Sequence, residues 1–491
     1  MQTENVQPER SAGRIIARNT LFGIGSQFAL RVAGFIFTIV VVRTLGDDNF
    51  GEYSIVLAWA GLFSVIGDMG INQYLAREIA RNHEIVHELF WDTVVLRMIL
   101  AIAASVITIG GAILVAHYPT AVVIGIALFT ATYYFSALVA PLQSILTGYE
   151  RLDIISVLNV LNQIIYMVLA GLFLYLGFNF VWLVIAGVTS MPVIAFMQWR
   201  AVRRNHLGPP RFRINRRMWF SLIKAGAPFA VTQLALTFAN QVDSIFLSSL
   251  TNAQTVGWYS AAYRLTLTLY NLSLAFNTAV MPTLAREHAR DPNSVRAWYY
   301  ASARFIAIIT LPIAVGGSIL NQQIVLIYGQ EFYVSSLAFA LLIWDLPFVV
   351  FHAFSGYITA SIKKEGAAAR IHVTIGVLNI VLNAILIPRF GLIGACFATV
   401  LTDFVGAALF YRLFRRVLGA GLMFHRMIQI VIAAAIMGAV VWILRGSSLA
   451  ITIPVSALVF GGLIWFSGAM TVEERHRIIH LIKRGLALRA V

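Results

Sequence analysis

Five cationic side chains lie inside long apolar stretches of this sequence: Arg31, Arg97, Lys224, Arg264 and Arg304. A charge at the centre of a membrane helix costs about 2.5–3.5 kcal/mol even on lenient insertion scales, so such residues usually face a polar cavity or a charged partner. A guanidinium group in a cavity binds phosphate or carboxylate groups through two parallel hydrogen bonds. The arginines are therefore candidate anion-binding residues, and an internal ion pair that ties helices together is the alternative.

Two of these arginines share a helix face with polar or small residues. Arg31 has Gln27, Gly34 and Thr38 at helical spacing, and Arg264 is followed on its own face by further polar residues. Both are predicted to face a polar interior, whereas Arg97 has only a mild stripe of this kind. The complete set of predicted binding residues is Arg31, Arg264, Arg97, Gln27, Asn240 and Asn271.

Acidic residues inside apolar segments are candidate proton or cation sites, or partners of the arginines. Asp243 is the first candidate for ion coupling, because it lies beside polar residues that include Asn240, and Asp345 is the second. An ion pair between Asp243 and Arg264 is the preferred pairing. His352 and His372 are interpreted as ordinary buried or interfacial residues.

The elements that must position these residues are membrane-spanning helices. The chain has 491 residues, of which 59% are hydrophobic and 12% charged, and its mean hydropathy is +0.81. Soluble domains carry about 25% charged residues, so the composition predicts an all-α polytopic membrane protein. Segments of about 20 apolar residues give fourteen predicted spans, at 17–42, 53–73, 89–115, 121–146, 154–176, 179–199, 219–249, 257–281, 299–320, 334–360, 370–388, 391–411, 427–444 and 449–470.

The distribution of basic residues predicts the orientation. If the N-terminus is cytoplasmic, 28 Lys and Arg residues fall in cytoplasmic segments and three fall on the outer side. This asymmetry follows the positive-inside rule and places both termini in the cytoplasm. The net charge of +15 is thereby explained by topology, so no nucleic-acid partner is expected. The predicted location is the cytoplasmic membrane.

Two short motifs occur twice and indicate an internal duplication. YLAREIAR at 74–81 returns as TLAREHAR at 283–290, and Gly-x-Tyr-Ser occurs at 51–54 and at 257–260. Six spans separate equivalent positions, so the halves have the same orientation and form a parallel repeat. The prediction is a lobe of six helices at 1–205, a second at 206–418, and two extra C-terminal helices with a basic cytoplasmic tail at 419–491.

The two octapeptides have two open interpretations. Their arginines, which include Arg77 and Arg286, can reach the lipid headgroups and anchor the helix ends. Alternatively, Glu78 and Glu287 pair across the lobe interface and close an inner gate together with these arginines. Duplication explains the recurrence under either interpretation.

Sequence signatures of catalysis are missing. The sequence has no GxxxxGK[ST], HExxH, CxxC or GxSxG motif, and no extramembrane segment is long enough for a catalytic domain. Cys396 is the single cysteine, which excludes an intramolecular disulfide and a thiolate metal cluster. We therefore expect no enzyme, no metal and no cofactor. A passive structural membrane protein is a further alternative, although the charges inside the spans argue against it.

Two stretches point to a family. RTLGDDNFGEYS at 43–54 and NQVDSIFLSSLTNAQTVGWYSAAYRL at 240–265 resemble polysaccharide and O-antigen (Wzx-type) flippases of the multidrug/oligosaccharidyl-lipid/polysaccharide exporter superfamily. The resemblance covers spans 1–12. Flippases of this family are similar in fold to lipid II flippases and MATE drug antiporters. The resemblance implies two lobes around a V-shaped cavity, alternating access, and a polyprenyl-pyrophosphate-linked oligosaccharide that moves from the inner to the outer leaflet.

The cargo implied by this resemblance agrees with the arginines, because Arg31 and Arg264 would complement its phosphates. Membrane lipids are further expected partners, and a proton or sodium ion and glycan polymerase or assembly proteins are left open. An ion-coupled MATE-like drug exporter is the first alternative, although cationic drugs would favour an acidic cavity. A lipid II flippase is the second.

Overall fold

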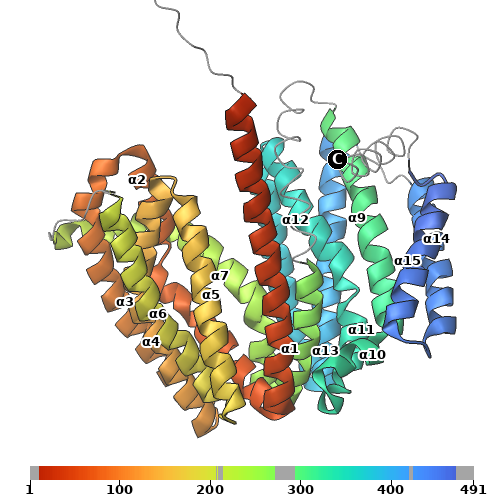
Figure 1. The fold of residues 1–491 in the computed structure, drawn as a ribbon, viewed down its shortest axis with the longest axis horizontal. Coiled ribbons are helices and arrows are strands. Elements are labelled where there is room, and N and C mark those ends of the chain that lie inside the picture. Colours follow the sequence, from red (N-terminus) through yellow and green to blue (C-terminus); the bar gives the residue numbers. More distant parts are fainter. Residues whose placement is uncertain (1–9, 206, 208–213, 271–293, 420–423, 471–491) are drawn as a thin grey trace, which may run out of the picture. The chain divides into compact units, whose positions relative to one another are not determined.

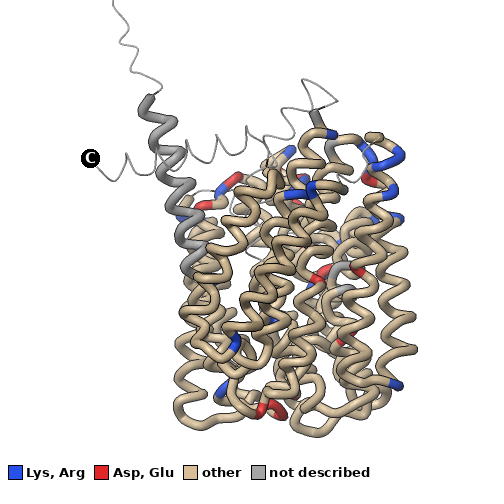
Figure 2. The backbone as a smooth tube through the Cα atoms, turned by 90° about the vertical axis from the view of Figure 1, so that its right-hand side faces the viewer, with Lys and Arg blue, Asp and Glu red and all other residues tan. Residues whose placement is uncertain are grey.

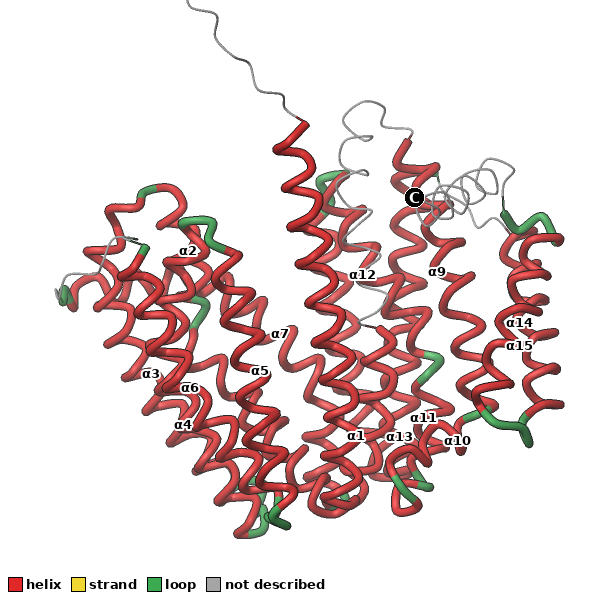
Figure 3. Tube along the Cα trace, in the orientation of Figure 1, coloured by secondary structure: helices red, strands yellow, loops and turns green. Residues whose placement is uncertain are grey.

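The computed structural model describes residues 10–205, 207, 214–270, 294–419 and 424–470. Within these ranges the regular secondary structure is helical, with no strand (Figure 3). The α-helices are α1 (Arg10–Asp68), α2 (Ile71–Arg81), α3 (Val86–Leu114), α4 (Thr120–Gly148), α5 (Leu152–Tyr175), α6 (Phe180–Arg204), α7 (Trp219–Leu250), α9 (Ser294–Ile319), α10 (Asn321–Val325), α11 (Ser335–Leu342), α12 (Asp345–Ser361), α13 (Glu365–Leu418), α14 (Phe424–Leu444) and α15 (Leu449–Phe466).

The chain is a multi-pass membrane protein. Eight of the described helices are long and apolar enough to cross a bilayer, or up to eleven if each bent pair forms one span. The 54 residues of α13 would extend about 80 Å, which far exceeds a hydrocarbon core of about 30 Å. The helix is broken at Gly391 (φ 52°), and α1 is broken at Gly46 (φ 73°), a conformation that glycine adopts without penalty. The count of fourteen stays a prediction, because part of the predicted span 257–281 lies outside the described residues.

The described residues form two compact units, one of Met1–Gly46 with Trp59–Leu234 and one of Asp47–Ala58 with Ala235–Val491. The first unit contains the bundle of α2, α3, α4, α5 and α6 (Figure 1). Apolar residues of α2 recur every four positions at Ile71, Leu75 and Ile79, and all three are fully buried in a core that includes Leu142 and Leu146 of α4. The predicted division of the chain at residues 205 and 206 stays a prediction.

Several basic helix ends of the first unit lie side by side. The Arg151 guanidinium donates a 2.9 Å hydrogen bond to Oδ1 of Asn205, which joins the start of α5 to the end of α6. The rings of His83 and Tyr149 stack with centroids 4.1 Å apart, which joins the end of α2 to the end of α4. Lys and Arg residues lie mostly near helix ends and leave long uncharged stretches between them (Figure 2). The arrangement agrees with a shared membrane side for these ends; the orientation itself stays a prediction.

A buried carboxylate anchors the chain segment that enters α7. Asp92 of α3 is fully buried. Its carboxylate accepts hydrogen bonds from the backbone N–H of Asn215 at 2.8 and 3.0 Å and from Nε1 of Trp219 at 2.8 Å. These bonds fix the start of α7 to α3 within the first unit.

Two glycines make a close reciprocal contact in the second unit. A Cβ atom on Gly51 would overlap the carbonyl oxygen of Ala253, and a Cβ atom on Gly257 would overlap the carbonyl oxygen of Asp47. Each glycine thus meets the residue four positions before the other. Gly51 and Gly257 are the first residues of the two Gly-x-Tyr-Ser motifs. A reciprocal contact of this kind is the pattern that a two-fold symmetric pairing produces.

The α14 helix packs on α9, and α15 packs on α14. An apolar core that includes Ile430, Met437 and Phe460 joins α14 and α15, with Leu311 and Val315 of α9 packed against it. These are the helices expected as extra C-terminal spans. Elsewhere in the second unit, α12 packs against α13 and α9, and α11 packs against α13.

Candidate functional site

Asp243 lies at the centre of a buried polar cluster in the second unit. The residue is 7% exposed on α7. Its carboxylate accepts hydrogen bonds from the Tyr259 hydroxyl at 2.6 Å, the Thr399 hydroxyl at 2.8 Å and Nδ2 of Asn383 at 2.6 Å. The same Nδ2 donates to Oδ1 of Asn379 at 3.1 Å. The predicted ion pair of Asp243 with Arg264 is not formed; neutral groups from three helical segments surround the carboxylate instead.

The cluster has the chemistry of a small cation or proton site. Oδ1 of Asn383 is buried without a hydrogen-bond partner, so it is an oxygen acceptor that remains available. Carboxylate, amide and hydroxyl oxygens are the ligands that hard cations prefer, and a buried carboxylate can also take up a proton. Among the described residues there is no group of three or more His, Cys, Asp or Glu residues that could hold a metal ion. Cys396, fully buried, lies one turn before Thr399.

Arg264 and Arg31 belong to different units. Arg264 is half-buried in the second unit, and its guanidinium lies 5.3 Å from the ring centre of Phe50, close enough for a cation–π contact. Arg31 is exposed on α1 in the first unit. The hydroxyl of Thr38, in the stripe of Arg31, donates back to the Gly34 carbonyl at 2.9 Å. Of the two arginines predicted to face a polar interior, Arg264 is therefore half-buried and Arg31 is exposed.

The remaining predicted binding residues are only partly described. Asn240 is exposed on α7. Gln27 lies in α1, but its side chain is outside the described part, and Asn271 lies outside the described residues altogether.

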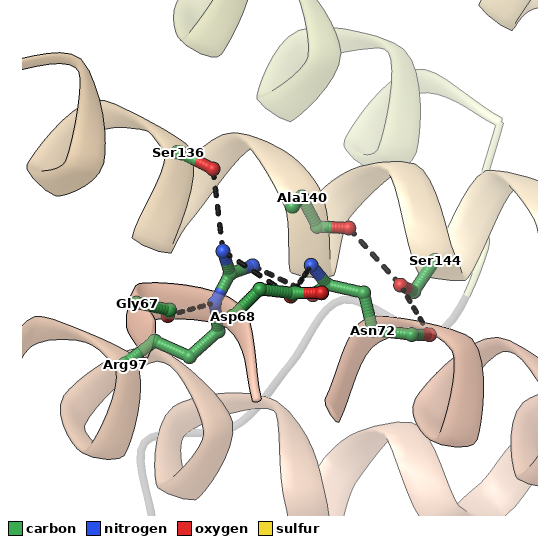
Figure 4. A network of polar contacts seen from close by, with 7 residues as sticks. All are labelled: Gly67, Asp68, Asn72, Arg97, Ser136, Ala140 and Ser144. Atoms are coloured by element: carbon green, nitrogen blue, oxygen red, sulfur yellow. Dashed lines mark hydrogen bonds and ion pairs between the residues drawn. The ribbon is translucent and has the colours of Figure 1, made fainter. Parts of the chain in front are cut away.

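Arg97 is held entirely by protein groups (Figure 4). The residue is 2% exposed on α3. Its Nη2 lies 3.4 Å from Oδ1 of Asp68 and 3.2 Å from the Ser136 hydroxyl, Nη1 lies 2.7 Å from Oδ1 of Asn72, and Nε lies 3.2 Å from the Gly67 carbonyl. All three guanidinium nitrogens are engaged, and the network joins the end of α1 and the start of α2 to α3 and α4. This geometry matches the alternative of an internal ion pair.

The first octapeptide forms ion pairs within its own helix. Glu78 lies 3.1 Å from Nη2 of Arg77 and 3.3 Å from Nη1 of Arg81. Arg286 and Glu287 of the second octapeptide lie outside the described residues, so the pairing of Glu78 with Glu287 stays a prediction. Arg77 also lies over the rings of Tyr74 and Phe229, which is consistent with an anchoring role.

The second predicted ion-coupling residue, Asp345, has partners that the sequence analysis did not select. Asp345 is 5% exposed at the first position of α12, and it is hydrogen-bonded to the side chain of Asp403 from α13. His352 lies seven residues after Asp345 on α12, and its Nδ1 is 3.4 Å from Oδ1 of Asp403. The seven-residue spacing places Asp345 and His352 on one helix face, which is the signal by which His352 could have been found.

Comparisons with known proteins agree with this architecture. Residues 16–288 match the family described as "Polysaccharide biosynthesis protein", and residues 228–389 match the family described as "MatE". Two proteins of Haloferax volcanii are similar over about four-fifths of each chain. "Probable low-salt glycan biosynthesis flippase Agl15" is 23% identical over 82% of this chain and 82% of its own length, and "Probable flippase AglR" is 24% identical over 81% and 83%.

The fold is that of solved exporters. The lipid II flippase MurJ, in an inward closed conformation, superposes with a TM-score of 0.78 at 14% identity, over 93% of this chain and 100% of MurJ. An inward-facing multidrug resistance MATE family transporter of the MOP superfamily superposes with a TM-score of 0.66 at 16% identity, over 80% of this chain and 98% of that one.

Proposed function

Because this chain belongs to the polysaccharide biosynthesis protein family, a family of transporters and not of enzymes, we propose that it is a flippase for a lipid-linked glycan. The cargo is a polyprenyl-pyrophosphate-linked oligosaccharide, which moves from the inner to the outer leaflet of the cytoplasmic membrane by alternating access. The family match over residues 16–288 carries the proposal. The two relatives named as flippases and the fold shared with MurJ support it.

The proposed architecture is that of the sequence analysis: fourteen spans, two six-helix lobes in parallel repeat, two extra C-terminal spans, and both termini in the cytoplasm. The reciprocal contact of Gly51 with Gly257 supports the repeat, because these residues begin the duplicated motifs. Glycan polymerase or assembly proteins are further proposed partners.

The pyrophosphate of the cargo binds Arg31 and Arg264. Arg264 is half-buried beside the ring of Phe50, and none of the described carboxylates forms an ion pair with it. Arg97 is omitted from the proposed site, because its three guanidinium nitrogens are already engaged. A charge-assisted hydrogen bond contributes about 1.5–3 kcal/mol, so loss of either arginine should weaken cargo binding about 10- to 150-fold.

Substitution of each arginine tests this assignment. Arg31→Ala and Arg264→Ala should nearly abolish glycan export, and Arg31→Lys should retain part of it, because lysine keeps the charge but loses the paired donors. Export is measured per molecule of membrane-inserted protein. This normalisation separates an effect on cargo binding from an effect on the amount of protein in the membrane. Arg151→Ala is the matched control, because Arg151 pairs with Asp153 at a helix start. Normal export per molecule in both alanine variants would rule the site out.

Asp243 is the proposed coupling residue, with a proton or a sodium ion as its ligand. The support is its burial and its three hydrogen-bond donors, next to an amide oxygen that has no partner. Asp243→Asn keeps the shape of the side chain and removes the charge. It should lower export and flatten the dependence of export on pH or sodium. Wild-type export with an unchanged dependence on both ions would exclude a coupling role.

A cell-based experiment separates the flippase from its alternatives. Removal of the chain from its host should deplete surface glycan while the lipid-linked precursor accumulates on the cytoplasmic side. Accumulation of lipid II with loss of cell-wall synthesis would indicate a lipid II flippase. Increased sensitivity to cationic drugs with intact surface glycan would indicate a drug exporter, and either of these outcomes contradicts the proposal.

A further inference from the structure

Two buried titratable residues of the second unit and one half-buried one have no part in the proposed cargo site or in the Asp243 cluster. Asp345 is 5% exposed and His352 is 7% exposed, and both lie on α12. The side chain of Asp403, from the second half of α13, is 20% exposed. Apolar helices surround them, so their charges are costly unless the three residues act together.

Asp345 lies at a break in a span. The helices α11 and α12 form a candidate span that bends by 41° between Leu342 and Asp345. Asp345 is the first residue of α12, where the free backbone N–H groups of a helix N-terminus favour an anionic side chain. Broken helices whose half-helix ends point at ligands are a recurrent feature of transporter binding sites.

The carboxyl groups of Asp345 and Asp403 lie close enough to share a hydrogen bond. The side chain of Asp403 is hydrogen-bonded to that of Asp345. An ionised carboxylate has only acceptor oxygens, so a hydrogen bond between two carboxyl groups requires that one of them carries a proton. The other oxygen of Asp345, Oδ1, is buried and has no hydrogen-bond partner. One shared proton would hold two carboxyl groups placed in this way, and Oδ1 of Asp345 would remain a free acceptor.

His352 gives this proton a route out of the pair. Its Nδ1 lies 3.4 Å from Oδ1 of Asp403, and its Nε2 is buried without a partner. The imidazole ring of His352 lies against Gly406. A Cβ atom at position 406 would come within 2.6 Å of the ring, so only glycine leaves enough space for the ring in this position. Nδ1 thus lies beside the carboxyl group of Asp403, and Nε2 lies beside Gly406, about one turn further along α13.

The charged and titratable neighbours come from every helix that packs around the pair. The α7 helix contributes Asp243, which is within electrostatic reach of Asp345. The α9 helix packs on α12 and carries one buried cation, Arg304. The described residues of α11, with the sequence SSLAFALL, contain no titratable group. Further neighbours are Tyr263 and Tyr270, which lie in the helical segment 253–270, and His372, which lies on α13.

We propose that Asp345, Asp403 and His352 form a proton-binding site, separate from Asp243, in which the carboxyl pair stores one proton and the imidazole passes it on. In the stored state, one proton lies between the two carboxyl groups and His352 is neutral with its proton on Nε2. Transfer of the shared proton to Nδ1 gives an imidazolium and two carboxylates, so the net charge of the trio stays at −1. Release of the Nε2 proton to water then takes it to −2. No bond other than N–H and O–H bonds forms or breaks.

Infrared spectroscopy of the purified full-length protein in lipid nanodiscs tests the proposal without any cargo. At neutral pH the wild type should show the carbonyl-stretch band of a protonated carboxylic acid, which shifts in D2O. Asp345→Asn and Asp403→Asn should each remove this band. Asp243→Asn, the matched control, should retain it, and Asp153→Asn should retain it as well. His352→Gln should keep the band but slow its exchange into D2O, because the imidazole route is lost.

The possible outcomes divide clearly. Loss of the band in either Asp345→Asn or Asp403→Asn, with a monodisperse elution profile, supports the proposal. A wild-type protein without the band, or a band that is lost only in Asp243→Asn, overturns it. A band that sodium chloride removes at constant pH would assign the pair to a metal cation and would overturn it too. Because no cargo is used, a failed export assay leaves this result unaffected, and the reverse also holds.

Discussion

Substitution of Gly257 by alanine is the sharpest structural test, because backbone atoms fill the space that a side chain would need. A Cβ atom on Gly257 would overlap the Asp47 carbonyl oxygen and lie 3.2 Å from its carbonyl carbon and from the Gly51 nitrogen. Ordinary contact begins at about 3.4 Å, and a backbone carbonyl cannot rotate away as a side chain would. Substitution of Gly51 would create the equivalent overlap, because a Cβ atom there would lie 2.5 Å from the Ala253 carbonyl carbon. The two helical segments would have to separate to accept either methyl group.

Overpacking of this kind costs about 1–3 kcal/mol. For a unit of this size, a loss of 1 kcal/mol lowers the melting temperature by about 2–4 °C, so Gly257→Ala should lower the melting temperature of the purified protein by several degrees. Gly376→Ala is the matched control, because Gly376 lies within α13 with nothing within 4 Å of its Cβ position. Both substitutions gain the same helix propensity, so their difference isolates the steric term.

The double variant sharpens the test. Gly51 and Gly257 make one shared contact, so the effect of Gly51→Ala with Gly257→Ala should be smaller than the sum of the single effects. Equal melting temperatures for Gly257→Ala and Gly376→Ala would refute the close crossing. They would also remove the structural support for the repeat.

Three further predictions concern the first unit and the topology. Arg97→Ala should cost about 1–3 kcal/mol in a denaturant or thermal unfolding assay, because it leaves the half-buried carboxylate of Asp68 without its cation and with the Asn72 amide as a donor; removal of both charges should cost less, and an equal cost would contradict the ion-pair network. Asp92→Ala should cost about 1–3 kcal/mol for each donor it leaves unpaired, and an unchanged melting temperature would show that the anchor at the start of α7 is dispensable. A cysteine introduced at Ser447 should react with a membrane-impermeant thiol reagent in intact cells, and one at Arg213 should not; the opposite pattern would reverse the predicted orientation.

The helical membrane fold could be predicted from the sequence because apolar length and charge placement report directly on the bilayer. The structure places Asp243 among polar side chains, and its selection as a coupling residue stays a prediction. Its partners could not be selected, because Asn383 and Thr399 are more than 100 positions away and become neighbours only through helix packing. The predicted pairing with Arg264 was wrong for the same reason.

Arg97 shows the limit of reading a charge inside a span. The sequence allows either a cavity or a partner, and only the packing of Asp68 against α3 decides for the partner. The break before Asp345 was not predicted, although Pro347, the third residue of α12, is a signal that could have found it, because proline cannot donate to the Ile343 carbonyl four residues earlier. Asp345 and Asp403 lie on two different helices, α12 and α13. Their proximity depends on how these helices pack, so residue spacing within one segment cannot reveal it.

The single cysteine, Cys396, can report on the Asp243 cluster without any introduced label. Cys396 is fully buried one turn before Thr399, whose hydroxyl bonds to Asp243. A thiol reagent therefore reacts with the unmodified protein only while the packing around this turn of α13 is open. The alkylation rate of the wild type, measured with and without a sodium or pH gradient, becomes a footprint of how often the cluster is exposed, and it needs no introduced label.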